Sequence, residues 1–113
     1  MKSITTTLQM VRDELNKIEG ATFFHYRRNP KVKAEYGVWM EIGENTAFNA
    51  DNNKAEQQIG GTLDYYTLIE FNPVIDKIQE ALNKLSVGAW ALESVQYEDE
   101  TNLIHYEWTF SVR

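Results

Sequence analysis

The chain contains no cysteine, which excludes disulfide bonds, thiolate nucleophiles and cysteine-ligated metals together. It has only two histidines, His25 and His105, and neither has a ligand-like companion three or four residues away. No apolar run approaches the roughly 18 residues of a membrane span. The first 20 residues contain charges throughout, instead of the apolar block of a signal peptide. We therefore expect a soluble, unexported protein with no membrane contact, no metal and no cofactor.

Positive charge is also scarce, because 17 acidic residues stand against 11 basic ones and give a net charge of −6. Such a chain is repelled by nucleic acid at long range, so we expect no specific nucleic-acid binding. Four cations nevertheless gather in one short stretch, namely Arg27, Arg28, Lys31 and Lys33. Two interpretations stay open for them. They form a charged turn between two strands, since Asn29 and Pro30 favour turns, or they form a contact patch for phosphate or an acidic partner.

Two segments have the periodicity of amphipathic helices. Apolar residues at positions 4, 8, 11, 15 and 18 form one stripe, and Gly20 is the expected end of the first helix. Asn72 and Pro73 predict the start of the second, because asparagine caps free amides and proline is tolerated in the first turn. Its buried side contains residues 74, 78, 81, 82 and 85, and Gly88 is its expected end.

The other regular segments predict strands, at residues 23–27, 36–42 and 62–69 and in a hairpin at 90–112. The last strand is the clearest, since residues 104, 106, 108, 110 and 112 are apolar and those between them are polar. In a single domain of 113 residues, the resulting order is α-β-β-β-α-β-β. It predicts an α+β fold with an antiparallel or mixed sheet of about five strands and both helices on one face.

Residues 43–58 show no apolar period, and connections longer than about 12 residues are usually functional or disordered. We expect a flexible loop or hairpin arm here, which either contacts a partner or is idle. Its acidic residues are Glu44, Asp51 and Glu56.

The remaining motifs do not indicate an enzyme. Gly60 and Gly61 precede a strand and lack a lysine-hydroxyl pair, so a bulge or close backbone approach explains them better than a nucleotide-binding loop. Three consecutive carboxylates occupy the tip of the last hairpin, Glu98, Asp99 and Glu100. Consecutive side chains on an extended tip splay apart, unlike the ligands of a calcium loop. These three acids are therefore candidates for partner contacts, together with the acids of the arm.

Three runs resemble small proteins of the head–tail morphogenesis block of long-tailed bacteriophages and prophages of Gram-positive bacteria. They are residues 61–67 (GTLDYYT), 71–82 (FNPVIDKIQEAL) and 94–108 (SVQYEDETNLIHYEW). In size and element order the chain is similar to the tail-terminator or tail-completion group. Connector and stopper proteins of similar size stay open as relatives.

The resemblance implies a structural protein without covalent chemistry. Such a protein forms a ring of identical copies, a hexamer by analogy, that caps the tail tube or joins it to the head connector. It would reside in the virion, at the tail or head–tail junction, after assembly in the host cytoplasm. The acids of the arm and of the hairpin tip would face the lumen or a neighbouring ring, since an acidic lining discourages DNA from binding. The alternative is a small acidic adaptor that engages a basic partner.

Overall fold

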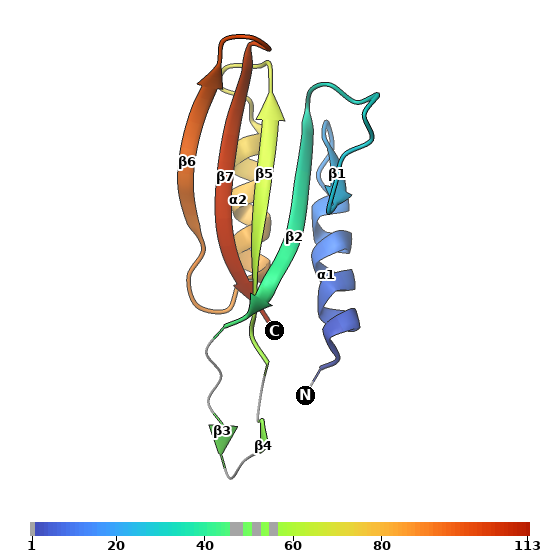
Figure 1. Ribbon diagram of the computed structural model, residues 1–113, viewed down its shortest axis with the longest axis vertical. Coiled ribbons are helices and arrows are strands. Elements are labelled where there is room, and N and C mark those ends of the chain that lie inside the picture. Colours follow the sequence, from blue (N-terminus) through green and yellow to red (C-terminus); the bar gives the residue numbers. More distant parts are fainter. Residues whose placement is uncertain (1, 46–48, 51–52, 55–56) are drawn as a thin grey trace.

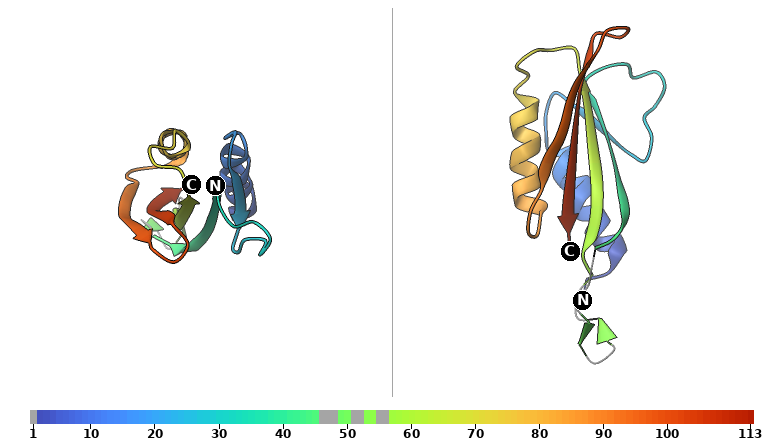
Figure 2. Two further views of the ribbon diagram at one scale, coloured as in Figure 1. Left: turned by 90° about the horizontal axis from the view of Figure 1, so that it is seen from above. Right: turned by 60° about the vertical axis from the view of Figure 1, so that its left-hand side comes forward.

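The computed structural model describes residues 2–45, 49–50, 53–54 and 57–113. Its elements are α1 (Ile4–Asn16), β1 (Thr22–His25), β2 (Tyr36–Glu44), β3 (Asn49–Ala50), β4 (Asn53–Lys54), β5 (Ile59–Thr67), α2 (Val74–Leu85), β6 (Ala91–Glu98) and β7 (Leu103–Val112). Five of the strands form one sheet in the order β1-β2-β5-β7-β6, in which only β1 and β2 are parallel. Both helices cover one face of this mixed sheet (Figures 1 and 2), which confirms the predicted α+β fold.

Helix α1 begins at Ser3, whose hydroxyl oxygen accepts a hydrogen bond of 3.1 Å from the Thr6 amide. Its apolar stripe is buried at Val11 and Leu15. The helix ends at Asn16, earlier than predicted, because the Ile18 amide bonds to the Leu15 carbonyl in the tighter i to i+3 pattern. Ile18 thus stays buried outside the helix.

Helix α2 starts as the sequence predicts, because the side-chain oxygen of Asn72 accepts a hydrogen bond of 2.9 Å from the Val74 amide. Val74, Ile78 and Leu82 are buried against the sheet. The helix ends at Leu85, since Ser86 is already extended. Gly88, the predicted end, lies in the connection that follows.

The core lies between the helices and the sheet. Of the five residues on the predicted apolar side of β7, Trp108, Phe110 and Val112 are buried, while Ile104 and Tyr106 are half-buried. The indole nitrogen of Trp108 donates to the side-chain oxygen of Gln79 on α2, at 3.2 Å, so this large buried ring is also satisfied. Gly61 lies where a Cβ would come within 2.6 Å of the Phe110 ring. The predicted close approach at this glycine is therefore correct.

The hairpin of β2 and β5 continues past the end of the five-stranded sheet. The Asn45 amide donates to the Gln58 carbonyl at 2.9 Å, and β3 pairs with β4 beyond it (Figure 1). Glu44 lies exposed at the end of β2. Asp51 and Glu56, the other acids assigned to the arm, lie outside the described residues.

Candidate interaction surfaces

The face of the sheet opposite the helices is open and has a row of three stacked rings. Tyr36 of β2, Tyr66 of β5 and His105 of β7 are direct neighbours in the strand register. Ring centroids are 4.8 Å apart for the tyrosines and 4.3 Å apart for Tyr66 and His105. The His105 Nε2 lies 3.1 Å from a carboxylate oxygen of Asp64. We call Tyr36, Tyr66 and His105 the aromatic row.

Burial raises the pKa of both tyrosines of this row. Burial, with help from the nearby Asp64 carboxylate, raises the pKa of Tyr66 to about 12. Burial also raises the pKa of Asp64, although its hydrogen bond with His105 works in the opposite direction. The stacked rings of the aromatic row form a rigid, mainly apolar surface on the open face of the sheet. The row is therefore suited to contact with another surface.

One end of the open face is hollowed, with a volume of about 530 Å³. We call this the end hollow; its lining includes Arg28, Lys33, Tyr36, Tyr66 and Glu98. The structure thus brings two residues of the predicted basic patch and one of the predicted acidic tip to the same hollow.

Arg28 has a structural task beside this hollow. Its guanidinium lies 5.4 Å from the centroid of the Tyr36 ring and donates to the Val32 carbonyl at 2.8 Å. The side-chain oxygen of Asn29 accepts from the Lys31 amide at 3.0 Å, so the predicted turn is correct. The turn directs Arg27, Lys31 and Lys33 to the exposed surface.

The two edges of the sheet have opposite charge. Residues 22–34 include the edge strand β1 and part of its connection to β2. They contain four cations, all in the connection, and no acid; we call them the basic edge. Residues 91–100, which include the edge strand β6 and its turn, contain four carboxylates and no cation; we call them the acidic edge. Figure 1 shows β6 and β1 on opposite sides of the molecule. Both clusters are visible in the sequence, but their assignment to different edges depends on the strand order.

Most charged side chains of these two edges form no ion pair within the described part of the chain. In the described part of the protein, no ion pair involves Arg27, Lys31, Lys33, Glu98, Asp99 or Glu100. Exposed apolar side chains accompany them. On β6, Leu92 is 42%, Val95 51% and Tyr97 60% exposed. Figure 1 explains this exposure, because α2 lies behind β5 and β7 while β6 extends beyond it.

A second exposed apolar group is the loop between β5 and α2, where Phe71 is 89% exposed beside Leu68 and Ile69. The Glu35 carboxylate fixes this loop. It accepts hydrogen bonds from the Thr67 hydroxyl at 2.5 Å, the Leu68 amide at 2.9 Å and the Asn72 side chain at 2.8 Å. The sequence analysis missed Glu35, because nothing local distinguishes it from the charged residues that precede it.

His25 is the other imidazole and lies on the helix side of the sheet. Its ring stacks between Tyr26, at 3.7 Å, and Trp39, at 3.8 Å, and its Nε2 lies 2.7 Å from a Glu41 carboxylate oxygen. Burial favours a higher pKa of Glu41, but hydrogen bonds from Tyr26 and His25 outweigh it and hold that pKa below its usual value.

The surroundings of His25 do not complete a catalytic constellation. A cleft of about 220 Å³ adjoins the ring, and α1 contributes Thr5, Gln9 and Arg12 to its lining. A hydrolytic site also needs a nucleophile in hydrogen-bond reach of the base. Among the described residues, Glu41 is the one hydrogen-bond partner of the His25 ring. The stacking and the carboxylate contact therefore explain His25 as a packing residue.

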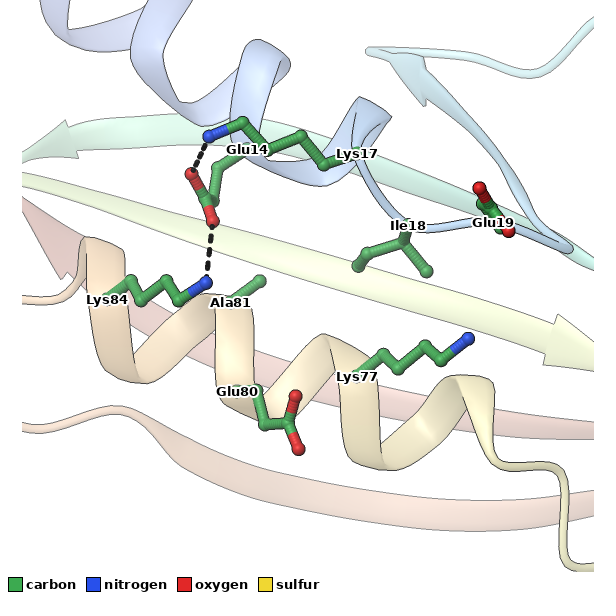
Figure 3. A pocket seen from close by; sticks show the side chains of 8 residues that line it. All are labelled: Glu14, Lys17, Ile18, Glu19, Lys77, Glu80, Ala81 and Lys84. Atoms are coloured by element: carbon green, nitrogen blue, oxygen red, sulfur yellow. Dashed lines mark hydrogen bonds and ion pairs between the residues drawn. The ribbon is translucent and has the colours of Figure 1, made fainter.

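A groove of about 290 Å³ separates the two helices (Figure 3). Glu14 of α1 bridges Lys17, at 3.0 Å, and Lys84 of α2, at 3.6 Å. The hydrogen bond from Lys17 is the main cause of the lowered pKa of Glu14. Since both lysine side chains are largely exposed, these pairs contribute little stability. The groove is best explained as the seam where the helices meet.

Within the described ranges, no three histidine, cysteine, aspartate or glutamate side chains gather where they could hold a metal ion. No helix in the same ranges is long and apolar enough to cross a bilayer. No protein-family model matches the chain, and no curated protein matches it in sequence.

Proposed function

We propose that the protein is a non-enzymatic assembly protein of a phage or prophage tail. In this role it forms a ring from copies of itself and caps the tail tube or joins it to the head connector. The observation that carries the proposal is the opposite charge of the two sheet edges. A ring joins identical subunits through two different and complementary patches, whereas a two-fold dimer uses one self-complementary patch.

The two ends of the molecule also suit a joining protein. Leu68, Ile69 and Phe71 lie near one end of the sheet, and β3 and β4 extend beyond the other end (Figure 1). In a ring whose axis runs along the strands, all copies would present the same end in the same direction. One side of such a ring would then differ from the other, as a protein that connects two different structures requires.

The proposal is tested in the phage or prophage that encodes the chain. Deleting the gene is expected to leave filled heads and separate tails, or tails of abnormal length, in electron micrographs. Supplying the gene in trans is expected to restore joined virions. Normal yields of joined virions after the deletion would overturn the proposal.

The acidic adaptor is the second candidate, because the carboxylates of the acidic edge would attract a basic partner equally well. The two candidates differ in self-association. A chain that stays monomeric at high concentration, and on purified tails, but binds a basic protein would favour the adaptor.

A further inference from the structure

We infer that copies of this chain contact one another edge to edge, with the acidic edge of one copy (residues 91–100) against the basic edge of the next (residues 22–34). The inference rests on the proposed ring and names the surfaces that form it. Its starting point is that β6 and β1 each have a neighbour on one side within the described sheet. An exposed strand edge without proline is a template for pairing with another chain, and neither β6 nor β1 contains proline.

Charge selects the partner of β6. Pairing β6 with β6 of a second copy would bring together two sets of four carboxylates and no cation. Pairing the acidic edge with the basic edge instead brings four carboxylates toward the segment whose β1–β2 connection holds four cations. Two of these cations, Arg28 and Lys33, also line the end hollow with Glu98 of their own copy. Like charges placed opposite each other are destabilising in a sheet, while complementary charge speeds and orients association. The contact is therefore head to tail.

Strand direction permits the same contact. Strand β1 is parallel to β2, and each further step across the sheet to β6 reverses direction, so β6 runs antiparallel to β1. Rotation about an axis parallel to the strands preserves these directions. In a ring of that kind, β6 of one copy would run antiparallel to β1 of the next. It would also meet residues 26–35, which Figure 1 draws on the outer side of β1.

The two edges also lie at the same position along the direction of the strands. One row of register partners crosses the whole sheet, from Thr22 through Tyr36, Tyr66 and His105 to Gln96. The stretch of β6 free of its bulge, residues 94–98, is five residues long, and β1 is four residues long. Thr22 of one copy is thus placed to lie near Gln96 of another.

Apolar side chains add to the contact. Val95 and Tyr97 are more than half exposed on the acidic edge, and Tyr26 is 54% exposed at the basic edge. Charge alone would give a weak and salt-sensitive contact, since exposed ion pairs contribute little. Burial of these side chains would supply the affinity, while the charges fix which edges meet.

The absence of native cysteine allows a clean test by disulfide cross-linking. Thr22→Cys and Gln96→Cys are made as separate single variants with tags of different size, mixed and oxidised. Cα atoms of paired antiparallel strands lie within the range that a disulfide spans. We expect the mixed dimer to exceed either homodimer on the order of tenfold. The matched control, Gln96→Cys mixed with Asp76→Cys on exposed α2, should give no such excess.

Charge reversal provides the second readout. One variant combines Lys31→Glu with Lys33→Glu, and the other combines Asp99→Lys with Glu100→Lys. Each alone should weaken self-association on the order of tenfold, and a mixture of the two should restore association between them. Asp76→Lys with Glu80→Lys, on α2, is the matched control and should not weaken it.

The outcomes separate the inference from the proposed function. If both charge-reversal variants form rings as readily as the wild type, or if Gln96→Cys homodimers exceed the mixed dimer, the inference is wrong. Either result leaves the proposed function in place. Edge-to-edge association of a chain that is dispensable for virion assembly supports the inference and overturns the proposed function. A wild-type chain that stays monomeric, alone and on purified tails, overturns both.

Discussion

At the scale of single residues, the Tyr65 hydroxyl is buried without a hydrogen-bond partner among the described residues. Burying an unpaired hydroxyl costs free energy, while the ring itself packs in the core. We predict that Tyr65→Phe raises the free energy of unfolding by about 1 kcal/mol, measured by urea denaturation. A loss of stability would show that the hydroxyl has a partner.

Glu35 is the opposite case, because its carboxylate accepts from Thr67, Leu68 and Asn72. Replacing it leaves these donors unsatisfied, so Glu35→Ala should lower the free energy of unfolding by about 2–3 kcal/mol. Amide exchange at Leu68 should accelerate in the same variant. The exposed Glu70 lies in the same loop, and Glu70→Gln should change stability little. Equal effects of the two variants would contradict the role given to Glu35.

Two carboxylates should give pH effects of opposite sign. The lowered pKa of Glu41 stabilises the fold above the ordinary glutamate pKa, and this contribution is lost as pH falls through the folded value. The raised pKa of Asp64 means that its ionised form costs stability, and this cost appears as pH rises past the ordinary aspartate pKa. We predict that Glu41→Gln destabilises more at pH 7 than at pH 3. The free energy of unfolding of Asp64→Asn, relative to wild type, should increase from pH 3 to pH 7. Urea unfolding at both pH values measures this, and parallel pH dependences for both variants would contradict it.

At the scale of elements, local patterns predicted most of the fold. The cap at Asn72 and the alternation in β7 are encoded by neighbours in sequence, so both helices and the order of elements could be predicted. The helix ends could not be placed from Gly20 and Gly88, since both helices stop earlier. The parallel pairing of β1 with β2 could not be predicted either. It depends on the path of residues 26–35 across the edge of the sheet, which no local pattern encodes.

Two glycines near the arm provide a matched pair at this scale. A Cβ at Gly61 would lie 2.6 Å from the Phe110 ring and 2.9 Å from the Met40 carbonyl oxygen, whereas a Cβ at Gly43 would meet nothing within 4 Å. We predict that Gly61→Ala lowers the free energy of unfolding by about 1–3 kcal/mol, because overpacking forces the core to shift. Gly43→Ala should change it by no more than about 0.5 kcal/mol. Thermal unfolding of both variants measures the difference, and equal changes would contradict the close contact.

At the scale of the whole molecule, the candidate surfaces were only half predictable. The cations at 27–33 and the carboxylates at 98–100 are visible in the sequence as clusters. Their placement on opposite edges depends on the order β1-β2-β5-β7-β6, which is a long-range property. The register that aligns Tyr36, Tyr66 and His105 is of the same kind. The strand order therefore places the two charge clusters at different edges of the sheet, where they form surfaces of opposite charge.

The central claim is that the chain assembles head to tail through oppositely charged edges. The most direct measurement is sedimentation velocity of the wild-type chain at rising concentration, in about 50 mM and about 1 M salt, where the Debye length falls to about 3 Å. The account predicts one closed oligomer whose dissociation constant rises from low to high salt, because salt screens the charges of the two edges while the apolar contacts remain. An oligomer indifferent to salt would contradict it, as would a chain that stays monomeric both alone and on purified tails.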